Sequence, residues 1–165
     1  MSNHAIIDTP VGDLTLVGED NALTGVYFRE HRHAPDAAMF GSRDDAVFAA
    51  AAEQLAQYFA GERTSFDLPL APKGDAFQQK VWALLRDIPY GETRSYGQLA
   101  TALGDRNLSR AVGAANGKNP ISIIVPCHRV IGADGNLVGY GGGLDRKRFL
   151  LGLEELEEVK VERLF

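Results

Sequence analysis

Cysteine is almost absent from this sequence: among 165 residues only Cys127 carries a thiol. A single cysteine cannot form an internal disulfide bond or a zinc site built mainly on cysteines. We therefore expect a protein of a reducing compartment, the cytoplasm, without a metal or other cofactor. Long apolar runs are also lacking, since no stretch approaches the roughly 18 residues of a membrane span. The N-terminus has no basic region followed by an apolar run, so no signal peptide is expected.

Basic residues are scarce in the first part of the chain. Residues 1–72 contain four Arg and no Lys against eleven acidic residues, a net charge of −7. Residues 73–148 contain four Lys and seven Arg against six acidic residues, a net charge of +5, and residues 149–165 carry −3. The overall charge of −5 argues against a nucleic-acid partner, but the basic block could face a polyanion. A solvated surface explains the asymmetry equally well.

The residues that are present indicate an ordinary globular chain, with 45% hydrophobic and 24% charged residues. Three short apolar segments separated by turn residues predict β-strands: residues 5–8, 14–17 and 23–28. An apolar face over residues 44–60, followed by Gly61, predicts a helix. The segment 67–74 is dense in proline and glycine and marks a domain boundary. We expect an N-terminal α/β domain of residues 1–72 and a C-terminal domain of residues 73–165.

The second domain has the pattern of several short helices. Amphipathic spacing predicts a helix over residues 75–86. Glycines that follow residues 103 and 116 indicate the ends of two more helices, residues 96–103 and 110–116. Ser95 and Ser109 are placed to cap the second and third helices. Two short helices joined by a polar turn suggest a helix-turn-helix unit, although most such pairs are only packing units.

The last third of the chain is expected to contain a strand, a hairpin and a helix. The β-branched run 121–125 predicts a buried strand that Pro126 ends, so the Cys127 thiol would lie just past a strand end. Residues 130–138 resemble a hairpin or wing. A glycine-rich loop follows, and Asp145 is expected to cap a helix that reaches about Glu158.

The neighbours of Cys127 suggest a reactive thiol, although a lone cysteine is most often a small buried hydrophobe. His128 could supply a base, and Arg129 with the surrounding basic block would favour the thiolate. Adjacent residues on a strand point to opposite faces, so a turn or a bridging water must connect thiol and imidazole. Glu154 is a candidate to orient the histidine. Because Glu154 lies in an acidic run, a solvated face is its simpler interpretation.

The run Pro126-Cys127-His128-Arg129-Val130 resembles the active-site signature of the O6-alkylguanine-DNA alkyltransferases. Further segments are similar to that family: residues 77–82, 88–93, 95–96, 110–113 and 139–140. The similarity is dense from about residue 77 to residue 154 and looser in the first 72 residues. It implies an α+β fold, in which a small ribonuclease-H-like sheet-and-helix domain is followed by a winged helix-turn-helix domain.

The resemblance also implies an activity. In that family an alkyl group moves irreversibly from O6-alkylguanine in DNA to the cysteine, with O4-alkylthymine as a further candidate substrate. The chain would then be a methylated-DNA–[protein]-cysteine S-methyltransferase that acts once, because a thioether is a poor leaving group. Its partner would be double-stranded DNA, bound by a monomer through the minor groove with the alkylated base flipped out.

The family's reactive groups match five positions of this sequence. Cys127 matches the alkyl acceptor, and His128 the residue that deprotonates it through a water. Glu154 matches the acid that orients the imidazole, and Asn119 the hinge that shapes the site. Tyr96 matches the tyrosine that donates a hydrogen bond to the guanine; without the resemblance, Tyr96 would be interpreted as a core aromatic.

The DNA-binding and pocket positions follow from the same resemblance. Arg110 matches the arginine that fills the place of the flipped base, although alone it would be an ordinary surface charge. The other expected DNA contacts are Tyr96, Ser95, Ala111 and Arg129. The expected pocket wall is formed by Tyr140, Gly141 and Val130. Histidines 4, 31 and 33 are interpreted as surface residues.

Two expectations separate this chain from part of the family. Some relatives hold a structural zinc in the N-terminal domain through cysteines and histidines, whereas residues 1–72 contain no cysteine, so no zinc is expected. The charge of −7 in that domain predicts that DNA contact is confined to residues beyond about 73. The residues alone leave three alternatives: a lesion sensor that binds without transfer, a Cys-His hydrolase, and a transcription regulator.

Overall fold

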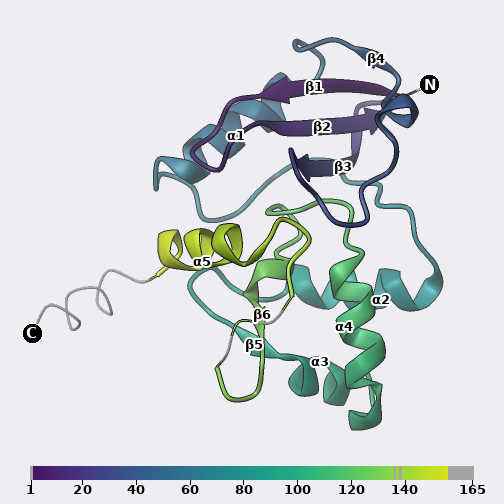
Figure 1. Ribbon diagram of the computed structural model, residues 1–165, viewed down its shortest axis with the longest axis vertical. Coiled ribbons are helices and arrows are strands. Elements are labelled where there is room, and N and C mark those ends of the chain that lie inside the picture. Colours follow the sequence, from purple (N-terminus) through teal and green to yellow (C-terminus); the bar gives the residue numbers. More distant parts are fainter. Residues whose placement is uncertain (1, 136, 138, 156–165) are drawn as a thin grey trace, which may run out of the picture.

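The computed structural model describes residues 2–135, 137 and 139–155. Figure 1 shows a sheet with one helix across it at the top and a group of helices below, with the chain crossing between the two parts. The expected α+β class is confirmed. None of the described helices is both long and apolar enough to cross a membrane.

A four-stranded sheet forms the upper part. Its strands are β1 (Asn3–Ile7), β2 (Leu14–Glu19), β3 (Ala22–Phe28) and β4 (Ser42–Arg43), in the order β3-β2-β1-β4. The first three strands pair antiparallel, as their short separations predict, and β4 joins β1 in parallel. Asp20 and Asn21 both have positive φ, of 51° and 67°, as a tight two-residue hairpin requires.

Helix α1 (Ala49–Phe59) covers the sheet and begins five residues later than the expected start at residue 44. Its start is delayed because Asp44 and Asp45 accept hydrogen bonds from the backbone amides of Ala46 and Ile6 instead. Such local side-chain bonds offer the backbone an alternative to the helix. A 3-10 turn, η1 (Ala37–Phe40), lies between β3 and β4.

Three helices form the lower part of the molecule (Figure 1): α2 (Ala76–Arg86), α3 (Tyr96–Ala102) and α4 (Ser109–Gly117). Asp75 and Ser95 cap α2 and α3 in reciprocal capping boxes, as expected for Ser95. The cap predicted for Ser109 is wrong. The chain enters α4 through a 3-10 turn, η2 (Arg106–Leu108), and the Ser109 hydroxyl donates to the Arg106 carbonyl within it.

The strand predicted for residues 121–125 is wrong. Ile121 forms only an isolated bridge with Val26 of β3, and the following residues turn, with Ile123 at a φ of 71°. The Val125 amide donates to the Ile121 carbonyl at 3.0 Å, and the whole segment is buried between the two parts of the molecule. The apolar run therefore reflects burial on all sides, which a packed turn achieves as well as a strand.

The end of the chain folds back beneath α1 (Figure 1). After a 3-10 turn η3 (Cys127–Arg129), β6 (Val130–Ile131) pairs in parallel with β5 (Arg94–Ser95). Residues 136 and 138 of the predicted hairpin lie outside the described residues. Helix α5 (Leu144–Leu153) follows Gly143 directly, so Asp145 lies exposed in its first turn and is not its cap. Residues 156–158 of the expected helix also lie outside the described residues.

Candidate active site

Cys127 lies at the first position of η3, not past a strand end, and is 5% exposed. Burial raises the pKa of its thiol to about 11, although a hydrogen bond from Asn119 and the charge of Lys147 act in the opposite direction. The expectation that its neighbours favour the thiolate is therefore corrected for the resting protein. The thiol is protonated at neutral pH, and a base must take its proton when it reacts.

His128 and Glu154 form a buried pair next to the thiol. His128 Nε2 lies 2.6 Å from Glu154 Oε2, and neither residue is more than 1% exposed. An ionised carboxylate only accepts hydrogen bonds, so Nε2 carries the proton and Nδ1 holds the free electron pair. Nδ1 makes no hydrogen bond with the described residues. Glu154 is thus far from the solvated acidic face that its neighbours in the sequence suggested.

The charges of this pair are set by burial and by Arg129. Burial lowers the pKa of His128 below its ordinary value, so the imidazole is neutral and available as a base. Burial alone would raise the pKa of Glu154, but hydrogen bonds and charge from His128 and Arg129 lower it. The pair at rest is therefore a neutral histidine held by a carboxylate.

The DNA contact expected of Arg129 is not supported. Its guanidinium donates from Nε to Glu154 Oε1 at 2.7 Å and from Nη1 to the Ile88 carbonyl at 2.7 Å, and it is 6% exposed. A buried carboxylate requires a paired cation, and Arg129 supplies it. Its place is inside the site, not on the DNA surface.

Asn119 folds the chain around the thiol. Its side-chain amide donates to the carbonyls of Val125 and Ile121, at 2.8 and 3.3 Å, and its carbonyl oxygen accepts from the Ile121 amide. These bonds close the turn that precedes Cys127, and the hinge role of Asn119 stays a prediction. Asn116 adds a longer bond, of 3.4 Å, to the Cys127 carbonyl.

A cleft of about 380 Å³, within the range of small-ligand pockets, lies near Cys127 but is not lined by it. The lining residue Asn116 connects the two, because its side chain bonds to the Cys127 carbonyl. Tyr96, Tyr140 and Gly141 line it, together with Gly113 and Asn116 of α4. Tyr96 is half-buried and packs against Gly113, where a Cβ would lie 3.7 Å from its ring. Val130 is buried behind the cleft and does not line it. The structure thus brings Tyr96, Tyr140 and Gly141 together in one cleft near Cys127.

The N-terminal part of the chain also reaches this cleft, because Arg32 and His33 line it together with Lys118. The expectation that DNA meets only residues beyond about 73 stays a prediction. His31 is not the surface residue expected. It stacks on Phe28 and accepts a hydrogen bond from the Phe28 amide, and burial lowers its pKa to about 4.

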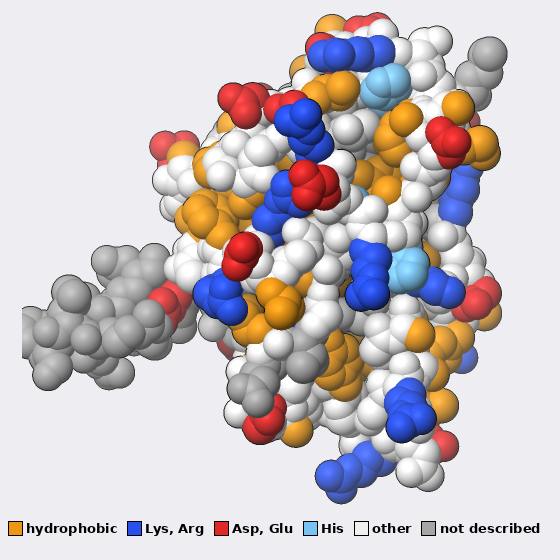
Figure 2. Space-filling model, in the orientation of Figure 1, with side chains coloured by type: hydrophobic (Ala, Val, Ile, Leu, Met, Phe, Trp, Pro, Cys, Tyr) orange, Lys and Arg blue, Asp and Glu red, His pale blue; other side chains and the backbone are white. Residues whose placement is uncertain are grey.

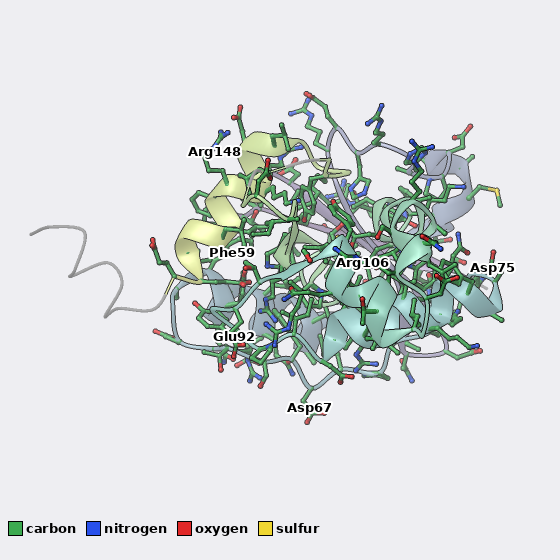
Figure 3. All side chains as sticks on the ribbon, turned by 90° about the horizontal axis from the view of Figure 1, so that it is seen from below. Phe59, Asp67, Asp75, Glu92, Arg106 and Arg148 are labelled. Carbon is green, nitrogen blue, oxygen red and sulfur yellow. The ribbon has the colours of Figure 1, made fainter. Side chains whose placement is uncertain are left out.

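The remaining predicted DNA contacts lie on the outside of the helical domain. Arg110 and Ala111 are exposed in the first turn of α4, whereas Ser95 is partly buried as the cap of α3. Figure 2 shows Lys and Arg side chains at the lower end of the molecule, which α3 and α4 form in Figure 1. In Figure 3, Arg106 projects from this helical end, while Arg148 lies apart from it on α5.

Lys147 is a site residue that the sequence did not single out. It is fully buried, and its ammonium group donates to the Val130 carbonyl at 2.6 Å and the Gly139 carbonyl at 3.2 Å, so it ties the glycine loop to the cysteine turn. Because Lys147 lies between Arg146 and Arg148 in the sequence, it resembles one of several surface charges. The signal was its spacing: Lys147, Leu150 and Glu154 share one helical face.

No group of three or more potential metal ligands occurs among the described residues. The chain matches the family model of the 6-O-methylguanine DNA methyltransferase ribonuclease-like domain over residues 3–72. It matches the model of the DNA-binding domain of the same methyltransferases over residues 76–156.

Relatives cover nearly the whole chain. A methylated-DNA–protein-cysteine methyltransferase of Mycolicibacterium paratuberculosis is 52% identical over 93% of each chain. One of Methanosarcina acetivorans is 50% identical over 92% of this chain and 97% of its own. A crystal structure of Mycobacterium tuberculosis OGT in complex with DNA is similar with a TM-score of 0.88, at 52% identity over 92% of each chain. On these matches, the chain belongs to the 6-O-methylguanine DNA methyltransferase family.

Proposed function

We propose that this chain repairs DNA by transferring one alkyl group from O6-alkylguanine to the sulfur of Cys127. The observation that carries this proposal is the buried thiol beside the His128–Glu154 pair, next to a cleft at the helical domain. Relatives of similar length are named for this reaction, and one of them is solved with DNA. Because the thiol must stay reduced, we place the protein in a reducing compartment such as the cytoplasm.

The resting thiol dictates the order of events. With a pKa of about 11, Cys127 must lose its proton to His128 Nδ1, directly or through a water, as the sulfur attacks the alkyl carbon. A carbon–sulfur bond forms while the bond from that carbon to guanine O6 breaks. The guanine leaves with the electron pair and takes a proton from water, while the imidazolium returns the cysteine proton to water. We propose that the Tyr96 hydroxyl donates a hydrogen bond to the departing base. The thioether product does not leave, so each molecule acts once.

The duplex must release its alkylated base to reach the thiol. We propose that residues 73–165 bind the minor groove through α4 and that Arg110 occupies the vacated place in the stack. The short side chains of Ala111 and Gly113 would allow a close approach of α4 to the groove. Residues 1–72 would add Arg32 and His33 at the mouth of the cleft.

The direct test is the intact mass of the protein after mixing with a duplex that carries a single O6-methylguanine. We expect each molecule to gain one methylene mass, which peptide mapping assigns to Cys127. Multiple turnovers would instead indicate a hydrolase, and duplex binding without a mass change would indicate a lesion sensor. Tight binding to one unmodified sequence over random duplex would indicate a transcription regulator.

Arg110→Ala should slow transfer from duplex DNA about tenfold, because the flipped state loses the side chain that replaces the base. Transfer from the free base O6-benzylguanine should remain unchanged, since no base pair is opened. Arg148→Ala is the matched control, because Arg148 carries the same charge on α5, apart from the helical end (Figure 3). Equal losses in the two variants, or a loss with the free base, would contradict the role given to Arg110.

A further inference from the structure

Glu154 is held by donors from both domains. His128, Arg129 and Glu154 itself belong to the C-terminal part of the chain. The third partner of the carboxylate is Tyr58 of α1, in the N-terminal part of the chain, whose hydroxyl donates to Glu154 Oε2. This is the same carboxylate oxygen that lies 2.6 Å from His128 Nε2. A residue 96 positions away in the sequence therefore shares the oxygen that orients the base.

The position of the Tyr58 hydroxyl is fixed by its surroundings. Tyr58 is fully buried, and its ring meets the rings of Phe59, Phe66 and Tyr90, with centroids 5.3, 5.5 and 6.3 Å away. Burial, followed by the charge of Glu154, raises the pKa of Tyr58. The hydroxyl therefore keeps its proton and remains a donor at every pH at which the protein works.

We propose that Tyr58 is a positioning residue for the alkyl transfer, through which the N-terminal domain holds the Glu154 carboxylate in the orientation that receives the His128 Nε2–H group. The inference rests on the proposed function, because it assigns His128 as the base. It gives the N-terminal domain a part in the chemistry, in addition to covering the C-terminal domain.

Two effects follow from the shared oxygen. With Tyr58 present, the carboxylate is fixed by bonds from two directions and cannot turn away from the imidazole. The Tyr58 hydroxyl also shares Oε2 as an acceptor, which weakens the hydrogen bond that this oxygen accepts from His128. Without the hydroxyl, the carboxylate would lose one of the bonds that fix its orientation, while Oε2 would accept the remaining bond from His128 more strongly.

The other groups that face the pair act differently: Arg129 bonds mainly to Oε1, at 2.7 Å, and reaches Oε2 only with a longer bond of 3.2 Å. The cations are Arg129 and Lys147, both of which disfavour an imidazolium, and the neutral groups are the Tyr90 and Tyr140 hydroxyls and the Cys127 thiol. Among the described tyrosines, only Tyr58 donates a hydrogen bond to the Glu154 carboxylate, whereas the Tyr90 hydroxyl donates to the Leu153 carbonyl.

The first experiment is Tyr58→Phe, which removes the hydroxyl and keeps the ring. Single-turnover transfer from an O6-methylguanine duplex is measured over a range of pH. We expect the plateau rate to fall roughly three- to tenfold, as the base loses its alignment. The acidic limb of the profile should move to higher pH, because a freer carboxylate stabilises the imidazolium.

Tyr90→Phe is the matched control. The Tyr90 hydroxyl donates to the Leu153 carbonyl at 3.1 Å, one residue before Glu154, so its loss weakens the same end of α5 without touching the carboxylate. Its acidic limb should coincide with that of the unchanged protein. A structural effect on α5 alone would move both variants equally, and this outcome would overturn the proposal.

A second measurement does not depend on transfer. The proton resonance of His128 Nε2–H should move downfield in Tyr58→Phe, as its bond to Glu154 strengthens, and stay in place in Tyr90→Phe. Site-specific 3-fluorotyrosine at position 58, a stronger donor that preserves the packing, should move it upfield. An unchanged resonance in both Tyr58 variants would refute the role of Tyr58. Absence of transfer by the unchanged protein would instead refute the proposed function, and the resonance would still decide on Tyr58.

Discussion

Cys127→Ser should yield a folded protein that binds duplex DNA but transfers no alkyl group to itself. The thiol of Cys127 has a pKa of about 11, which His128 can overcome when the proton moves as the carbon–sulfur bond forms. A serine hydroxyl is far less acidic than a thiol and a much weaker nucleophile towards a saturated carbon. After incubation with an O6-methylguanine duplex, the intact mass of the variant should therefore be unchanged.

The same substitution should have a modest effect on stability. Cys127 is buried, so a serine hydroxyl there would lose its hydration, and the hydrogen bond from Asn119 would replace that hydration only in part. We expect a loss of about 1–2 kcal/mol in the free energy of unfolding. Urea unfolding measures this loss, and fluorescence anisotropy with a labelled duplex measures retained binding.

Cys127→Ala is the control that separates chemistry from polarity. It removes the nucleophile without adding a buried hydroxyl, so it should be equally inactive and should lose stability only through the missing sulfur. A mass gain in either variant would show that the acceptor is another residue, and the proposed function would have to be rebuilt around it.

The elements that the sequence predicted well are those with local signals. The capping serine of α3 and the short strands around the Asp20–Asn21 turn depend on neighbours in sequence, and the structure confirms both. The strand at 121–125 failed because an apolar run reports only burial. Its turn is specified by the Asn119 side chain and by packing against β3, and neither is visible in the run itself.

The candidate site shows the same division. The resemblance to a family supplied Cys127, His128 and Glu154, but it could not give the charge of the resting thiol, which depends on burial. The resemblance also assigned Arg129 to the DNA surface, whereas the buried Glu154 carboxylate pairs with it inside the site. Tyr58 was missed because the contact that gives it a role crosses from one domain to the other.

Glu154→Gln, which replaces a buried charged side chain by an uncharged one, should lower the free energy of unfolding strongly. The amide keeps the shape of the side chain but removes the charge that Arg129 pairs with at 2.7 Å, in a position that is 1% exposed. Breaking a buried ion pair from one side costs about 3–5 kcal/mol, because the remaining charge is left without a partner. Urea unfolding at neutral pH measures this loss.

The same substitution should also lower the rate of alkyl transfer, for a different reason. A glutamine amide can donate to His128 Nε2, which moves the imidazole proton to Nδ1 and leaves no free electron pair towards the thiol. The corresponding change in a serine protease lowers the rate about 10⁴-fold. Because the thiol here must also lose its proton, we expect a fall on the order of 10³-fold or more in single-turnover transfer.

The shifted pKa values of Glu154 and His128 should also make the stability of the folded protein depend on pH. The folded protein holds the pKa of Glu154 below its ordinary value, so the carboxylate stabilises the fold above the unfolded pKa of about 4.3, and this contribution is lost as the pH falls. The lowered pKa of His128 acts in the same direction, starting near the unfolded imidazole pKa of about 6.5. The unchanged protein should therefore lose stability steadily on acidification from about pH 6.5.

In Glu154→Gln the carboxylate contribution is gone, so the free energy of unfolding should be lower at neutral pH and should vary less with pH below about 4.3. Glu53→Gln, an exposed change on α1, should reproduce the pH dependence of the unchanged protein. If Glu154→Gln kept the acid sensitivity of the unchanged protein and transferred at its rate, the carboxylate would be neither the counterion of Arg129 nor the orienting partner of His128. A second change, Arg129→Met, would separate the two roles of Glu154. It should restore stability, because the unpaired cation is gone, while transfer should remain absent, because the histidine still lacks its acceptor.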